Sequence, residues 1–73
     1  MAKAAWIREA QFMDKILAQP GMFKLDLIKT IAKATGVSIM TGLTILQSLK
    51  ETGLVISFVT GAMMINDRFW HKT

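Results

Sequence analysis

The stretch TGVSIMTGLTILQSLKETGLV, residues 35–55, carries the clearest structural pattern in the chain. Gly36 allows the left-handed backbone conformation that a tight turn after a helix requires. Ser38 is well placed to cap a helix that runs over about residues 39–51, and Gly53 is well placed to end it. The side chains expected to point inward from this helix follow helical spacing: Gly42, Ile45, Leu46 and Leu49. The stretch therefore predicts a turn, a helix and a second turn.

The opposite face of the same helix is predicted to be apolar and exposed. It carries Ile39, Met40 and Leu43, where a surface helix usually has polar side chains. A chain of 73 residues builds only a thin core, so both faces of one helix are hard to bury in a monomer. Methionine is common at adaptable binding surfaces. We therefore expect this face to contact another molecule.

Residues 5–18 are predicted to form an amphipathic helix that the Pro20-Gly21 pair ends. Its inward face is expected to hold Trp6, Ala10, Met13 and Leu17, flanked by Ile7 and Ile16. Phe12 is placed at the edge of this apolar stripe. We interpret Trp6 and Phe12 as core and dimer contacts rather than as platforms for stacking bases.

A second, shorter helix is predicted after the apolar residues 22–25, which form either a small strand or a lead-in to that helix. Asp26 is a candidate N-cap, because its carboxylate can accept the free amides of the first turn. Lys29 and Lys33 are expected on the exposed face, where phosphate contact and ordinary solvation are both open. The side chains expected to point inward are Leu27, Ile28, Ile31 and Ala32.

A β-hairpin is predicted after the third helix. Residues 54–59, LVISFV, are rich in β-branched side chains, and AMMIN at 62–66 is the candidate return strand. The Thr60-Gly61 pair is a candidate two-residue turn between them. A basic and aromatic tail, RFWHKT, ends the sequence.

Residues 28–55 resemble the winged helix-turn-helix family of small bacterial or phage and plasmid transcription regulators. The likeness is carried by Ile31-Ala32, Thr35 to Ser38, Thr41, Leu46, Leu49 and Gly53 to Val55. The resemblance implies an α+β fold, mainly helical, with three helices and a short C-terminal hairpin. A single domain is expected over 1–73: first helix at about 5–18, helix-turn-helix at about 26–52, wing at about 54–66 and tail at 67–73.

The resemblance also implies a DNA-binding transcriptional regulator that places residues 39–51 in the major groove of double-stranded DNA as a homodimer. The DNA-contacting residues implied are Lys29, Lys33, Ser38, Met40, Thr41, Thr44, Gln47, Thr60 and Arg68. The alternative is a winged-helix module that docks on a host protein such as RNA polymerase. It is favoured by the absence of Lys and Arg from residues 54–67 and by the apolar set that includes Ile39 and Leu43.

The composition of the chain narrows the classes of protein to which it can belong. The formal charge of +4 favours anionic partners such as nucleic acid. The absence of Cys excludes disulfides, and a single His with five scattered acidic residues gives no basis for an enzyme, a metal site or a cofactor. The uncharged runs 34–49 and 52–66 are shorter than the roughly 20 residues of a spanning helix. The N-terminus lacks the long apolar core of a signal peptide, so we expect a cytoplasmic protein.

Overall fold

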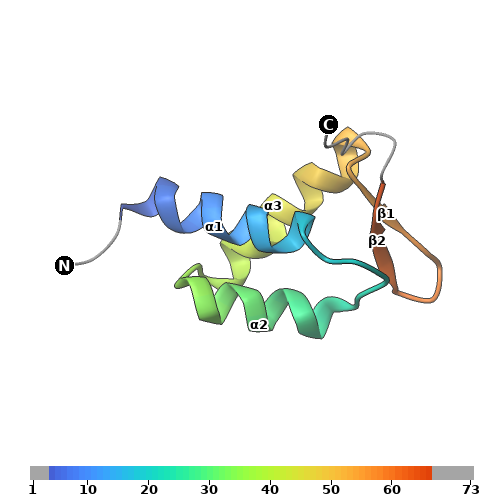
Figure 1. The fold of residues 1–73 in the computed structure, drawn as a ribbon, viewed down its shortest axis with the longest axis horizontal. Helices are drawn as coiled ribbons and strands as arrows, with labels where there is room; N and C mark the ends of the chain where they lie inside the picture. The colour runs from blue at the N-terminus through green and yellow to red at the C-terminus, as the bar shows by residue number, and fades with distance from the viewer. Residues whose placement is uncertain (1–3, 67–73) are drawn as a thin grey trace.

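A computed structural model describes residues 4–66 of the chain. The elements are α1 (Ala5–Leu17), α2 (Leu25–Thr35), α3 (Ile39–Thr52), β1 (Val55–Ser57) and β2 (Met63–Ile65) (Figure 1). Three helices followed by an antiparallel two-stranded hairpin form an α+β fold with the winged helix-turn-helix layout. The fold class predicted from the sequence is therefore confirmed. The tail, with Arg68, lies outside the described residues.

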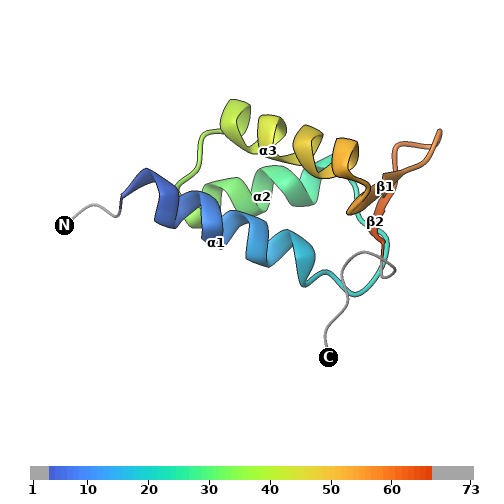
Figure 2. The ribbon, with the colours of Figure 1, turned by 90° about the horizontal axis from the view of Figure 1, so that it is seen from above.

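The helices and the hairpin are arranged so that α3 and the wing share one side of the molecule. Figure 2 shows α1 along one edge, α3 along the other, and the loop of the hairpin reaching toward the α3 side. The hairpin follows the C-terminal end of α3, which places it beside that helix (Figures 1 and 2). Within residues 4–66, no helix is both long enough and apolar enough to cross a membrane.

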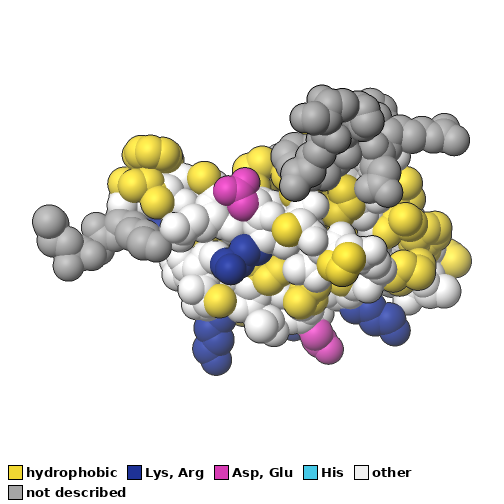
Figure 3. Space-filling model, in the orientation of Figure 1, with side chains coloured by type: hydrophobic (Ala, Val, Ile, Leu, Met, Phe, Trp, Pro, Cys, Tyr) yellow, Lys and Arg dark blue, Asp and Glu magenta, His cyan; other side chains and the backbone are white. Residues whose placement is uncertain are grey.

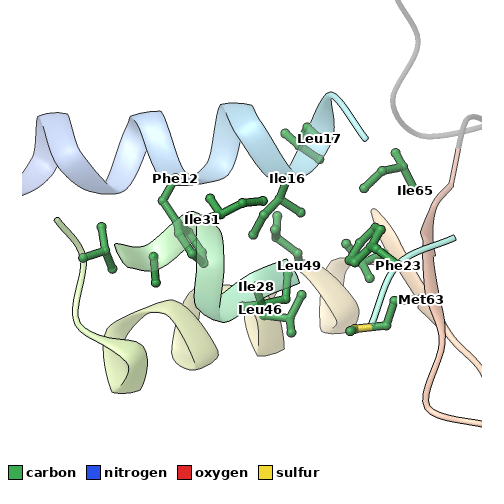
Figure 4. Close-up of a cluster of buried hydrophobic side chains, with 13 residues drawn as sticks. Phe12, Ile16, Leu17, Phe23, Ile28, Ile31, Leu46, Leu49, Met63 and Ile65 are labelled. Atoms are coloured by element: carbon green, nitrogen blue, oxygen red, sulfur yellow. The ribbon is translucent and has the colours of Figure 1, made fainter. Parts of the chain in front are cut away.

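The core joins side chains from every helix and from the hairpin (Figure 4). Burial of these apolar groups is the main force that holds the short elements together, because isolated helices of this length are marginal in water. The largest side chains that are fully removed from solvent are Phe12, Ile16, Ile28 and Leu46.

The inward face predicted for α1 is confirmed at Leu17 and at flanking Ile16, and it is wrong at Trp6 and Ala10. Trp6 is 72% exposed, Ala10 is exposed, and Phe12 is fully buried in the centre of the core. Figures 1 and 2 show that the first turn of α1, which carries Trp6, extends past the ends of α2 and α3. The buried face is formed by Phe12, Ile16 and Leu17.

The helix ends follow local chemistry, with one correction. Gly36 and Gly53 end α2 and α3 with left-handed φ values of 79° and 88°, as predicted. The N-cap of α2 is Lys24, which forms no side-chain capping bond, so the prediction of Asp26 as the cap is wrong. Asp26 lies in the first turn, where its negative charge still interacts favourably with the helix dipole.

The hairpin differs from the prediction in the length of its loop. Phe58 N–H donates to the Ala62 carbonyl at 2.8 Å, and Gly61 N–H donates to the Phe58 carbonyl at 2.9 Å. These bonds enclose a three-residue loop, 59–61, that closes with Gly61 at φ 93°. The predicted two-residue turn at Thr60-Gly61 is therefore wrong, because Val59 belongs to the loop and not to a strand.

The apolar segment at 22–25 contributes a single bridge rather than a strand. Phe23 and Met63 exchange two backbone hydrogen bonds, of 2.8 Å and 2.7 Å. This bridge ties the connection between α1 and α2 to β2. It holds the wing against the helical part of the fold.

Candidate nucleic-acid interface

The turn between α2 and α3 is held by hydrogen bonds of its own residues. The Oγ of Ser38 accepts the Thr41 backbone N–H at 3.1 Å, and its hydroxyl donates to the Thr41 Oγ1 at 2.9 Å. Val37 is buried, and its N–H donates to the Ala32 carbonyl at 2.9 Å. Ser38 therefore caps α3 as predicted. Its contact with a phosphate stays a prediction.

The outer face of α3, which we define as Ile39, Met40, Leu43, Thr44 and Gln47, projects away from the core. Ile39, Met40 and Leu43 are 49%, 80% and 38% exposed. Thr44 and Gln47 are exposed on the same face. The helix register inferred from the sequence is therefore confirmed, since none of these side chains is packed inside the subunit.

The polar groups of this outer face are already engaged within the helix. The Thr44 hydroxyl donates to the Met40 carbonyl at 3.0 Å. The Gln47 side-chain amide donates to a Glu51 carboxylate oxygen at 3.4 Å. Both side chains are exposed, and either can exchange its internal partner for an external one at small cost.

A surface hollow of about 460 Å³ lies between α2 and the start of α3. Two lysines of α2 border it, and apolar side chains from the turn and from α3 complete it. Its lining consists of Lys29, Thr30, Lys33, Val37, Ser38 and Ile39. Ile39 belongs both to the hollow and to the outer face of α3, so a cationic surface and an apolar surface are continuous.

The wing is apolar at its tip. Val59 is fully exposed, and Phe58 and Ile56 are each more than one third exposed. Figure 3 shows hydrophobic side chains gathered at the hairpin end of the molecule. Thr60 is exposed in the same loop, and residues 54–66 contain no Lys or Arg. Any contact made by this wing would therefore not involve basic side chains.

The two other residues predicted as protein contacts, Trp6 and Phe12, differ in their exposure to solvent. Phe12 is fully buried, which confirms it as a core residue and leaves it no surface for a dimer contact, whereas Trp6 is exposed on α1. Gly42, expected on the inward face of α3, is buried. A Cβ there would lie 3.0 Å from the Phe12 ring of α1 and 3.6 Å from Ala32 Cβ of α2. Gly42 therefore helps to set how α3 sits on both other helices.

Comparison with known proteins gives one family. A family model described as Firmicute plasmid replication protein (RepL) matches residues 21–72. The matched range includes α2, α3 and both strands of the wing, and it excludes α1. No curated protein and no solved structure matches the chain.

Proposed function

The chain belongs to the RepL family of Firmicute plasmid replication proteins, and we propose that it binds double-stranded DNA in plasmid replication. The observation that carries the proposal is the unobstructed outer face of α3, next to two exposed lysines of α2. A helix that projects from the fold beside cationic side chains suits the major groove, which is about 12 Å wide. We also propose that the protein acts in the cytoplasm, where plasmid DNA is replicated.

In this proposal the surface residues divide into two roles. Lys29 and Lys33 contact phosphates, and Thr44 and Gln47 approach base edges from the exposed side of α3. Met40 and Thr41 lie near the groove wall, at the N-terminal end of the helix. The loop of the wing, with Thr60, follows the duplex beside α3, since both lie on the same side of the molecule (Figure 2).

The test is a fluorescence anisotropy titration with labelled duplex DNA between about 50 and 200 mM salt. We expect the affinity to fall steeply as salt rises, because each neutralised phosphate adds about −0.9 to the slope of log K against log salt. Replacing Lys29 and Lys33 by Ala should reduce the magnitude of that slope by about 0.9 for each lysine. Lys15→Ala, on α1, is the matched control and should leave the slope unchanged.

The outcome against the proposal is an absence of binding at the lowest salt. An equal effect of the α1 control and the α2 variants would also count against it. The first result removes DNA as the ligand. The second assigns the affinity to net charge alone rather than to the surface around α3.

Two narrower features expected from the sequence belong to the same proposal. A homodimer would let one small module cover two half-sites, and exposed Trp6 of α1 offers a contact for it. Analytical ultracentrifugation should show a dimer that Trp6→Ser weakens, whereas a monomer with and without DNA would exclude it.

Regulation of transcription would use the same bound face at a promoter. A plasmid copy-number assay beside a reporter assay separates that role from replication.

Docking on a host protein is the second candidate function, favoured by the apolar outer face of α3 and the uncharged wing. Met40→Lys should abolish binding to a purified partner such as RNA polymerase while leaving the fold intact. Unchanged binding by this variant, or no binding by the wild type, would count against that candidate.

A further inference from the structure

We propose that the outer face of α3 selects A·T-rich duplex DNA by contacting the methyl groups of thymine. Met40 is the specificity-determining residue, and Ile39 and Leu43 flank it. The inference rests on the proposed DNA-binding function and names the class of sequence that the same surface prefers.

The outer face of α3 lacks basic side chains in its first turns. In helix-turn-helix proteins, the N-terminal turns of the recognition helix contact base edges. Guanine is read there mainly by Arg or Lys, which donate to its O6 and N7 atoms. The only cationic residue of α3 is Lys50, in its last turn. The first turns of α3 therefore present no group of the kind that most often reads guanine.

The outer face of α3 instead offers exposed apolar side chains. Met40 is the most exposed side chain of its apolar set, at 80%. Its long, flexible thioether adapts to more than one methyl position. In the major groove, thymine presents a C5-methyl group that unmodified cytosine lacks. An apolar face in this groove therefore gains a methyl contact at A·T pairs that unmodified G·C pairs do not offer.

The residues that surround the outer face favour DNA over a protein as its ligand. Ile39 lies in both the outer face and the hollow that Lys29 and Lys33 border. The occupant must therefore present negative charge directly beside apolar groups. A duplex does so along its whole length, because rows of phosphates flank the groove in which the thymine methyls lie.

The experiment replaces thymine by uracil, which keeps every hydrogen-bonding group and removes only the methyl. Affinity is measured by anisotropy on alternating A·T and A·U duplexes of equal length. We expect the A·U duplex to bind about fourfold more weakly for each methyl contacted, the value for losing one buried methylene-sized group. The reciprocal pair is a G·C duplex with and without 5-methylcytosine, where the added methyl should strengthen binding.

Variants of Met40 test whether this residue causes the difference in affinity between the A·T and A·U duplexes. Met40→Ala should bind the A·T and A·U duplexes with nearly equal affinity, and Met40→Leu should keep most of the difference. Met22→Ala, which removes an exposed methionine from the connection between α1 and α2, is the matched control and should discriminate as the wild type does. Both positions are exposed, so we expect each variant to keep the fold. Thermal unfolding of each variant checks this.

The outcomes separate this inference from the proposed function. Salt-dependent binding of equal strength to the A·T and A·U duplexes overturns the inference and leaves DNA binding in place. Discrimination that survives Met40→Ala overturns the role of Met40. An absence of binding to any duplex overturns the proposed function and the inference with it. If only a protein partner then binds through Met40, the face belongs to the second candidate function.

Discussion

Replacing Gly42 by Ala tests how α3 is seated on the rest of the fold. An ideal Cβ at this position would lie 3.0 Å from Cζ and 3.1 Å from Cε1 of Phe12. Carbon atoms in good contact are about 3.5–4.0 Å apart, so the methyl or the ring must move by about 0.5 Å. Phe12 is fully buried, and its ring has no route to solvent.

Two opposing terms set the size of the effect. Alanine gains about 1 kcal/mol over glycine in a helix interior. Overpacking a tight core costs about 1–3 kcal/mol. We therefore expect Gly42→Ala to lower the free energy of unfolding by about 1 kcal/mol, which in a domain of this size lowers Tm by about 4–8 °C.

The assay is thermal and urea unfolding followed by circular dichroism, with Phe12→Leu as the second background. Leucine removes the ring edge that the new methyl would meet, so in that background Gly42→Ala should stabilise the protein. A stabilising Gly42→Ala in the wild-type background would refute the close approach of α3 to α1. Equal effects in the two backgrounds would refute the assignment of that approach to Phe12.

The remaining predictions concern the turn before α3 and the reading face. Ser38→Ala should lower the free energy of unfolding by about 1 kcal/mol through loss of the cap, as measured by urea unfolding. Ser38→Asp should keep that stability but weaken DNA binding, because a capping carboxylate repels phosphate; equal binding would remove Ser38 from the interface. Gly36→Ala should destabilise by about 1–2 kcal/mol, since alanine is strained at a φ of 79°, and Gly36→Asn should cost less. Thr44→Ala should relax sequence preference in a competition assay, whereas Lys33→Ala should weaken all duplexes alike.

Features fixed by neighbouring residues were predictable from the sequence. The left-handed turn at Gly36, the cap at Ser38 and the end of α3 at Gly53 all follow from the chemistry of a few adjacent residues. The register of α3 follows from its two ends, and that register determines which side chains face outward. The exposure of Met40 was therefore predictable, although its ligand was not.

Features fixed by distant contacts were not predictable in the same way. The apolar residues of α1 allow two adjacent stripes, and both include Met13 and Leu17. The stripe that contains Phe12 is the buried one, because Gly42 on α3 leaves space for the Phe12 ring. Helical periodicity within α1 carries no information about that space. The hollow that joins Lys33 to Ile39 likewise depends on how α2 and α3 pack.

The loop of the wing shows a third limit. Val59 has a strong preference for strands, and the run 54–59 therefore extends the predicted strand up to the Thr60-Gly61 pair. The pairing of Phe58 with Ala62 places Val59 in the loop instead. Pairing between strands set the loop length here, and local propensity did not.

The most direct test of the central claim is an amide chemical-shift map of the labelled protein with and without duplex DNA at low salt. We expect shifts concentrated at Lys29 and Lys33, in the turn at residues 36–38 and along the outer face of α3, with little change at residues 11–15 of α1. Shifts confined to α1, or no shifts at saturating DNA, would contradict it.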